Sequence, residues 1–227
     1  MLNIAVLISG SGRTLDNFHE RIENGSLNCR IQVVVSNVDG VLGLEKAKNY
    51  GYPNFVAKDS TSTNAILEDF DIDIICLAGY LKLYTPPKPL KKQVVNIHPS
   101  IIPMYCGGGY YGDIVHRSVK ERGCMVSGCT VHFADEIYDN GPIILQKTVE
   151  LDYDDTIKDI AAKVFAVECE AYPEALNRVD AAMYVRAFGH RPRSRPEPIQ
   201  EAITRVWVST LYGQQWATSR TSTLYRK

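Results

Sequence analysis

The chain has 227 residues, enough for one large α/β domain or one domain with a tail, and 45% of them are hydrophobic, so it can bury a sizeable core. Of its 25 Lys and Arg and 26 Asp and Glu, residues 186–227 hold 8 and 2, which leaves 17 basic and 24 acidic side chains for residues 1–185. This acidic balance argues against a nucleic-acid partner. The chain starts with a strand pattern instead of a charged leader and a long apolar run, so we expect a cytoplasmic protein with no membrane partner.

Short apolar runs alternate with helical patterns, which predicts βαβ units and an open, mostly parallel twisted sheet of the α/β class. The expected strands cover residues 3–8, 31–36, 54–57, 72–77, 93–97, 127–133 and 143–149. The expected helices cover residues 13–24, 42–50, 64–70, 113–122 and 156–172. Beyond residue 175 the pattern weakens into a basic, proline-rich stretch at 191–198 and a short helix at 200–208. We therefore expect a domain at 1–178 and an extension at 179–227.

The first expected strand runs into a turn with two glycines, Ser9-Gly10-Ser11-Gly12-Arg13, that opens a helix. Free backbone N–H groups and the helix dipole at such a turn favour an anion, and Arg13 adds a fixed positive charge. The turn has neither the third glycine of a dinucleotide site nor the Gly-Lys-Ser/Thr of a P-loop. A phosphomonoester is the favoured ligand; an ordinary glycine turn is the alternative.

The expected strand at 93–97 ends in Asn96-Ile97-His98-Pro99. Because side chains alternate across a strand, Asn96 and His98 should face the same way. An amide N–H can hold an oxyanion, and an imidazole can move a proton near neutral pH, so the pair suits acyl transfer. The alternative is a strand end whose polar residues cap the next turn.

Three further features concern histidine, cysteine and glutamate side chains. His132 lies between Val131 and Phe133, and we expect it to be packed or hydrogen-bonded and not catalytic. The six cysteines include no Cys-x-x-Cys pair, which favours a reducing compartment and no metal site. Glu168 falls within the apolar stripe of the helix at 156–172, so its carboxylate needs a partner or a ligand.

Four segments of the chain occur in the order found in one known family: Val6–Gly12, Leu77–Tyr80, Asn96–Pro103, and Ser127–Phe133 with Asp139–Gln146. Over residues 3–176 they resemble the glycinamide ribonucleotide formyltransferases, the folate-dependent enzymes of purine synthesis. The resemblance implies the formyltransferase fold with a Rossmann-like N-terminal half. It also implies transfer of a formyl group from 10-formyltetrahydrofolate, as co-substrate, to the primary amine of glycinamide ribonucleotide, without a metal.

The resemblance also assigns residues to roles. Asn96 would donate a hydrogen bond to the oxyanion, His98 would assist proton movement, and Asp139 would position water or the imidazole. The residues implied to bind the ribonucleotide are Gly12, Arg13, Thr14, Pro99 and Glu168, with the phosphate on the first three. The residues implied to bind the folate are Lys58, Leu81, Lys82, Leu83, Tyr84, Asp135, Glu136, Ile137 and Tyr138.

The chain departs from the family in three places. The loop 106–112 is longer and richer in glycine and tyrosine than the usual version, which leaves its phosphate and amine contacts open. Lys82 stands where many relatives place arginine. Residues 183–227 match nothing in the family, and a partner-binding tail, a dimer arm and disordered sequence all remain open; we expect a monomer or a homodimer.

Other functions share the same three residues. A sugar-amine N-formyltransferase and a formyltetrahydrofolate hydrolase belong to the same superfamily, although the hydrolase normally carries an N-terminal domain for which we expect no room. Methionyl-tRNA formyltransferase has a basic C-terminal barrel, and the basic tail here is too short for one. From a different class, a folate- or nucleotide-binding protein without turnover would keep the pocket; the presence of Asn96, His98 and Asp139 together favours an enzyme.

Overall fold

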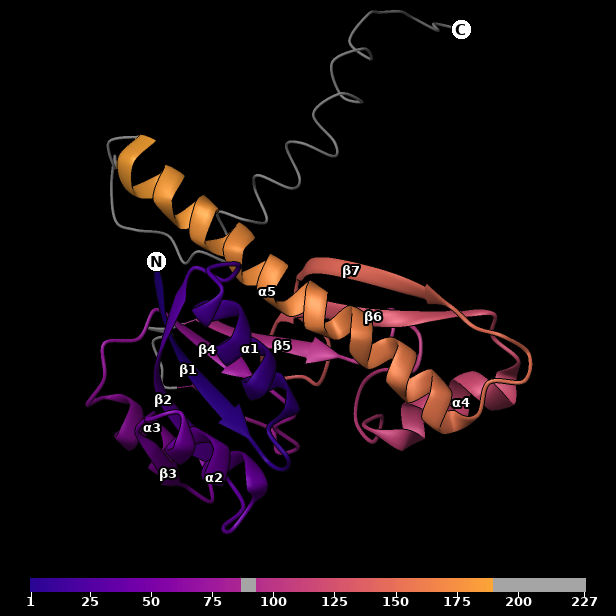
Figure 1. Cartoon of the computed structure of the whole chain (residues 1–227), viewed down its shortest axis with the longest axis horizontal. Coiled ribbons are helices and arrows are strands. Elements are labelled where there is room, and N and C mark those ends of the chain that lie inside the picture. Colours follow the sequence, from indigo (N-terminus) through magenta and orange to yellow (C-terminus); the bar gives the residue numbers. More distant parts are fainter. Residues whose placement is uncertain (87–92, 190–227) are drawn as a thin grey trace, which may run out of the picture.

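The computed structural model of the chain describes residues 1–86 and 93–189 (Figure 1). Its strands are β1 (Leu2–Ile8), β2 (Cys29–Ser36), β3 (Asn54–Val56), β4 (Ile74–Leu77), β5 (Gln93–His98), β6 (Val126–Phe133) and β7 (Ile143–Glu150). Its helices are α1 (Arg13–Glu23), α2 (Leu42–Asn49), α3 (Ser60–Leu67), α4 (Asp113–Arg122) and α5 (Ile157–Gly189).

The described strands form one sheet in the order β3-β2-β1-β4-β5-β6-β7. Neighbours from β3 to β5 pair in parallel, whereas β6 and β7 add to the β5 edge as antiparallel strands. The predicted open, mostly parallel α/β sheet is confirmed. The chain winds outward from β1 to β3 and then returns to β4, so the strand order reverses between β1 and β4, where open α/β sheets bind ligands at the carboxyl ends of their strands.

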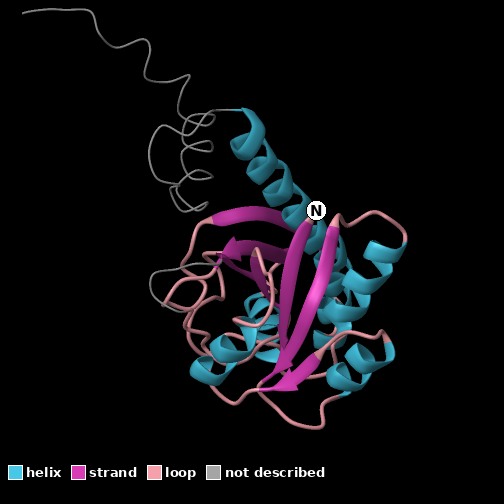
Figure 2. Ribbon diagram, turned by 90° about the vertical axis from the view of Figure 1, so that its left-hand side faces the viewer, coloured by secondary structure: helices cyan, strands magenta, loops and turns pink. Residues whose placement is uncertain are grey.

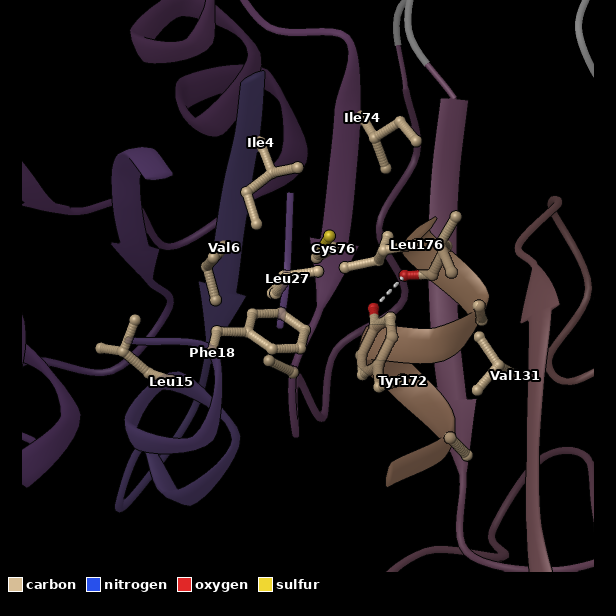
Figure 3. Close-up of a cluster of buried hydrophobic side chains, with 14 of the residues drawn as sticks. Ile4, Val6, Leu15, Phe18, Leu27, Ile74, Cys76, Val131, Tyr172 and Leu176 are labelled. Carbon is tan, nitrogen blue, oxygen red and sulfur yellow. Dashed lines mark hydrogen bonds between the residues drawn. The ribbon is translucent and has the colours of Figure 1, made fainter. Parts of the chain in front are cut away.

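Helices lie on both sides of the sheet (Figure 2) because the inner strands are apolar on both faces. On one face, Ile4 of β1 packs in a core with Phe18 of α1 and Tyr172 of α5 (Figure 3). On the other face, Leu7 of β1 packs in a second core with Leu67 of α3. This alternation along β1 is what a strand buried on both faces requires.

Helix α5 crosses the sheet beside β6 and β7 and is longer than expected (Figure 1). We expected it to end near residue 172, but it continues through Pro173 to Gly189 and passes residue 178, where we expected the domain to end. Its buried stripe continues with Tyr172, Leu176 and Val179. The Tyr172 hydroxyl donates to the carbonyl oxygens of Leu77 (3.2 Å) and Val95 (2.8 Å), which fixes the helix over β4 and β5.

The predicted helix at 64–70 is α3, which begins four residues earlier and ends three residues earlier. Its start is set by Asp59, whose carboxylate accepts from the Ser62 backbone N–H at 2.8 Å and so caps the helix. The expected helix at 200–208 falls outside the described residues. Among the helices of the described part of the chain, none combines the length and apolar character needed to cross a bilayer.

Candidate active site

A cavity of about 490 Å³ opens where the carboxyl ends of β1, β4 and β5 meet. Three segments at the carboxyl ends of these strands line it: residues 9–14, 78–81 and 96–99. The loop at 107–112, residues 138–139 and one face of α5 complete the wall. The cavity thus occupies the position that the reversal in strand order predicts.

Three of the predicted site residues meet in this cavity. Asn96 and His98 lie on the same side of β5, as strand alternation requires, and Asp139 reaches them from the loop after β6. Asp139 Oδ2 lies 3.3 Å from His98 Nδ1, and Asp139 Oδ1 lies 3.4 Å from Asn96 Nδ2. The carboxylate therefore stands between the amide and the imidazole.

Two backbone groups of the loop after β5 hold this arrangement. His98 Nε2 lies 2.8 Å from the Tyr105 carbonyl oxygen, and because a carbonyl can only accept, Nε2 must carry a hydrogen. The Gly107 N–H donates to Asp139 Oδ2 at 2.9 Å. Asp139 itself has a φ of 55°, a left-handed conformation that Asp tolerates better than most residues. Sequence reasoning missed both backbone partners, because any residue type supplies them.

The charges in the cavity follow from burial and from these contacts. Burial lowers the pKa of His98 below its usual 6.5, against the opposing effects of Asp139 and the Tyr105 carbonyl, so the imidazole is neutral at pH 7. Burial alone would raise the pKa of Asp139, but the hydrogen bond that its Oδ2 accepts from the Gly107 N–H stabilises the ionised form, so the pKa lies below its usual range. The neutral imidazole, with its hydrogen on Nε2, therefore presents an unprotonated Nδ1 to an ionised carboxylate across 3.3 Å, a gap in which a proton can be held.

His132 lies directly opposite Asn96 in the β5–β6 ladder and is fully buried. Its Nδ1 lies 2.8 Å from the Phe133 carbonyl oxygen, and its Nε2 lies 3.2 Å from Asn96 Nδ2. The distance from Nε2 to Asp139 Oδ1 is 3.6 Å, longer than a hydrogen bond. The expectation of a packed, hydrogen-bonded histidine is confirmed, and the His132 ring contacts the Asn96 amide from the neighbouring strand.

The predicted anion-binding turn lines the same cavity with Gly12, Arg13 and Thr14, and Pro99 lines it as well. The N-cap residue of α1 is Gly12, which has no side chain to cap the helix, so the backbone N–H groups of the first turn are open to a ligand. The Arg13 guanidinium carbon lies 3.5 Å from the centre of the Phe165 ring. This stacking holds a positive charge at the wall of the cavity and gives Phe165, which the sequence did not single out, a clear role.

The glycines of this turn have different tasks. Gly12 has a φ of 70°, and a Cβ there would come within 2.7 Å of Gly43 Cα on α2. A Cβ at Gly10 would meet no atom within 4 Å. Gly12 is therefore required for the close approach of α1 to α2.

Glu168 of α5 also lines the cavity, near Arg13. Among the described residues its carboxylate forms neither a hydrogen bond nor an ion pair, and burial raises its pKa to about 7, with Arg13 acting in the opposite direction. The awkward position of this carboxylate within an apolar stripe is thus explained by the cavity beside it.

The residues implied to bind folate divide into two groups. Leu81 and Tyr138 line the cavity and are 59% and 46% exposed, so they form an apolar rim that a flat ring could contact. The others lie outside the cavity wall: Lys58, Lys82, Leu83, Tyr84, Asp135, Glu136 and Ile137.

Several residues outside the wall have structural partners. Lys82 Nζ donates to the Lys58 carbonyl at 2.6 Å, and the Asp135 carboxylate closes its own loop by accepting from Ile137 N–H and from the Asn140 amide. Tyr84 is buried, and its hydroxyl donates a hydrogen bond to Asn64 Oδ1. No cluster of His, Cys, Asp and Glu within residues 1–86 and 93–189 has the arrangement of a metal site.

Comparisons with known proteins agree with this geometry. Residues 2–176 match the family described as formyl transferase. The chain is 36% identical over 184 residues to the chloroplastic phosphoribosylglycinamide formyltransferase of Vigna unguiculata, covering 76% of this chain and 59% of that one. It is 35% identical over 189 residues to the trifunctional purine biosynthetic protein adenosine-3 of Gallus gallus, covering 78% of this chain and 18% of that protein. The chain therefore spans less than two thirds of the length of these relatives.

Solved structures give the same result. The crystal structure of glycinamide ribonucleotide transformylase 1 from Symbiobacterium toebii is similar with a TM-score of 0.71 and 34% identity, covering 78% of this chain and 86% of that one. The phosphoribosylglycinamide formyltransferase from Brucella melitensis is similar with a TM-score of 0.70 and 30% identity, covering 79% and 96%.

Proposed function

The chain belongs to the formyl transferase family, and we propose that it transfers a formyl group from 10-formyltetrahydrofolate to the primary amine of glycinamide ribonucleotide. The observation that carries the proposal is the single cavity that joins Asn96, His98 and Asp139 to the first turn of α1. The three side chains offer a hydrogen-bond donor and a proton acceptor, and the turn offers a site for a phosphate. An acceptor with an amine and a phosphomonoester needs both groups.

In the proposed reaction the amine nitrogen forms a bond to the formyl carbon, and the bond between that carbon and N10 of the folate breaks. The formyl oxygen gains negative charge before the second bond breaks. Asn96 is the donor for this oxyanion because its Nδ2 faces the cavity and its contact to Asp139, at 3.4 Å, is long enough to be replaced. Donors that are already in place when charge develops lower the barrier.

The amine must lose a proton as it attacks, and N10 must gain one as it leaves. Asp139 lines the cavity and is ionised, and its Oδ2 lies 3.3 Å from His98 Nδ1. Since His98 Nε2 is committed to the Tyr105 carbonyl, the proton that Asp139 relays is held at Nδ1, from which it returns to the leaving nitrogen. The lowered pKa of His98 leaves Nδ1 without a proton before the reaction and favours release of the relayed proton to N10.

Different parts of the cavity wall are proposed to bind the acceptor and the folate. We propose that the α1 N–H groups and Arg13 hold the phosphate and that Glu168 holds the glycinamide ribonucleotide on the α5 side. Of the residues proposed to contact the folate, Leu81 and Tyr138 are the two that line the cavity. The assignments of Lys58, Lys82, Leu83, Tyr84 and the loop 135–137 rest on the resemblance alone.

The bounds of the domain, the oligomeric state, the partners and the location are also proposals. We propose residues 1–178 as the catalytic domain, in a monomer or a homodimer without nucleic-acid or membrane partners. The six cysteines are free thiols, a state that a reducing compartment maintains, and we propose the cytoplasm.

The test follows the release of tetrahydrofolate by absorbance with three acceptors: glycinamide ribonucleotide, a nucleotide-linked amino sugar, and water. We expect release with glycinamide ribonucleotide and at most a trace with the other two. Release with water alone would assign a hydrolase, and release with the amino sugar alone would assign a sugar-amine formyltransferase. Binding of the folate without release to any acceptor would assign a binding protein.

A further inference from the structure

We propose that His132 is a positioning residue that orients the Asn96 amide for catalysis; this inference rests on the proposed function. An asparagine amide can be turned over by half a rotation, which exchanges its NH₂ group and its carbonyl oxygen. In one orientation Asn96 presents N–H to an oxyanion, and in the other it presents an oxygen that repels one. The site therefore needs a group that distinguishes the two orientations.

The tautomer of His132 is fixed by its neighbour in the chain. Nδ1 lies 2.8 Å from the Phe133 carbonyl oxygen, which can only accept, so Nδ1 carries the hydrogen. In the neutral ring Nε2 then carries a lone pair and can only accept. The ring is 1% exposed, so water does not compete for either nitrogen.

The lone pair on Nε2 selects the orientation of the amide. Asn96 Nδ2 lies 3.2 Å from Nε2 and 3.4 Å from Asp139 Oδ1, so the NH₂ group faces two acceptors. A turned amide would place its oxygen against both, with no hydrogen between them. Because His132 takes one hydrogen in the shorter contact, the second hydrogen, held only by the longer contact to Asp139, is the one left for the oxyanion.

The backbone keeps the two side chains together. Asn96 and His132 are directly opposite one another in the antiparallel β5–β6 ladder, where facing side chains are neighbours. The same ladder pairs His98 with Thr130, so the strand that carries the catalytic candidates is aligned by the strand that carries His132. The pairing of β5 with β6 thus holds the Asn96 amide and the His132 ring side by side.

Three substitutions separate this role from packing. His132→Leu keeps an apolar volume without an acceptor, His132→Gln places an amide oxygen within reach of the Asn96 NH₂ group, and His132→Asn keeps a donor for the Phe133 carbonyl but is too short to place an acceptor beside Asn96. We expect kcat to fall by at least about 10-fold for His132→Leu and His132→Asn, with KM for both substrates little changed, and to recover in large part for His132→Gln. His132→Asn keeps the test valid should His132→Leu not fold.

A double-mutant cycle with Asn96→Ala identifies the route of the effect. If His132 acts through the amide, His132→Leu lowers kcat much less in the Asn96→Ala background than in the wild type. An equal loss in both backgrounds, or a loss that falls on KM, would overturn the proposal.

A second readout does not depend on turnover. Nitrogen-15 NMR of histidine-labelled protein reports which ring nitrogen of His132 is protonated, and we expect Nδ1. Protonation of Nε2 in the neutral ring would overturn the proposal even in an active enzyme. Conversely, a wild-type protein that transfers formyl to no acceptor but shows the Nδ1 tautomer would contradict the proposed function and not the acceptor role of His132 Nε2.

Discussion

Asn96 has one amide hydrogen held by a short contact and one held by a long contact, at 3.2 Å to His132 and 3.4 Å to Asp139. Removing both hydrogens removes the donor proposed for the oxyanion. We expect Asn96→Ala to lower kcat by about 100- to 1,000-fold, corresponding to about 3 kcal/mol or more in the barrier, with KM for both substrates nearly unchanged. Steady-state kinetics measures both values.

A matched control for this substitution is Asn49→Ala, at an exposed position near the end of α2. It should leave kcat at the wild-type value. A kcat for Asn96→Ala close to that of the control would remove the amide from the oxyanion site.

Glu168 makes stability depend on pH in a direction opposite to that of most carboxylates. Its pKa is raised by burial from 4.5 to about 7, so the stability linked to this group is fully present below pH 4.5 and is lost as the pH rises through about 7. We expect Glu168→Gln to remove this loss and to raise the free energy of unfolding above that of the wild type at about pH 8, by at most about 3 kcal/mol. Urea denaturation of the unliganded protein across this range provides the measurement.

The control for Glu168 is Glu121→Gln on the exposed side of α4. Its unfolding curve should follow that of the wild type at every pH. If the free energy of unfolding varied with pH in the same way for Glu168→Gln and the wild type, burial of the Glu168 carboxylate would not be the cause of the loss of stability.

At this scale the sequence indicates side chains but not their backbone partners. The alternation along residues 93–98 is enough to place Asn96 and His98 on one side of a strand. The Tyr105 carbonyl and the Gly107 N–H, which fix His98 and Asp139, leave no trace in residue types because every residue carries them. The orientation of His132 toward Asn96 was likewise hidden, since it depends on which residues of β5 and β6 face one another.

At the scale of elements, the contact between α1 and α2 sets the shape of the anion-binding turn. Gly12 packs against Gly43 so closely that a Cβ would lie 2.7 Å from Gly43 Cα, and its φ of 70° is strained for other residues. We expect Gly12→Ala to lower the free energy of unfolding by about 1–3 kcal/mol and to raise KM for the phosphorylated acceptor. Thermal unfolding and steady-state kinetics test the two effects separately.

Gly10→Ala is the matched control in the same turn, because a Cβ at Gly10 meets no atom within 4 Å. It should change the midpoint of unfolding little. A loss of stability as large as that of Gly12→Ala would show that the turn, and not the contact with Gly43, is responsible.

The boundaries of helices were predicted less well than their existence. The start of α3 was placed too late because Asp59 and the hydroxyl-rich turn after it supply a cap and no apolar periodicity. The end of α5 was placed too early because Pro173 is usually read as a stop signal. Tyr172, Leu176 and Val179 nevertheless continue the buried stripe, so tertiary packing sustains the helix beyond the proline.

At the scale of the whole molecule, the sheet collects residues that lie far apart in the sequence. The turn after β1, the segment after β4 and the end of β5 meet because the strand order reverses between β1 and β4. Alternating patterns predicted this class of sheet, but the antiparallel β6 that brings His132 beside Asn96 followed from neither charge nor composition.

The cavity-lining residues in the described part of the chain lie between Ser9 and Glu168. We therefore expect deletion of residues 190–227, after the last described residue of α5, to leave kcat within about twofold of that of the full chain. Kinetics of the truncated protein, with circular dichroism to confirm that it folds, measures this. A folded truncation without turnover would show that the C-terminal segment contributes to the site.

The central claim is that the α1 turn and the Asn96, His98 and Asp139 group serve one substrate in one cavity. The most direct test compares kcat/KM for glycinamide ribonucleotide with that for the same molecule lacking its phosphate, in the wild type and in Arg13→Ala. We expect the wild type to prefer the phosphorylated acceptor by about 100-fold or more and Arg13→Ala to lose most of that preference while KM for the folate stays the same. Equal activity of the wild type on both acceptors, or an equal rise of both KM values in Arg13→Ala, would contradict the account.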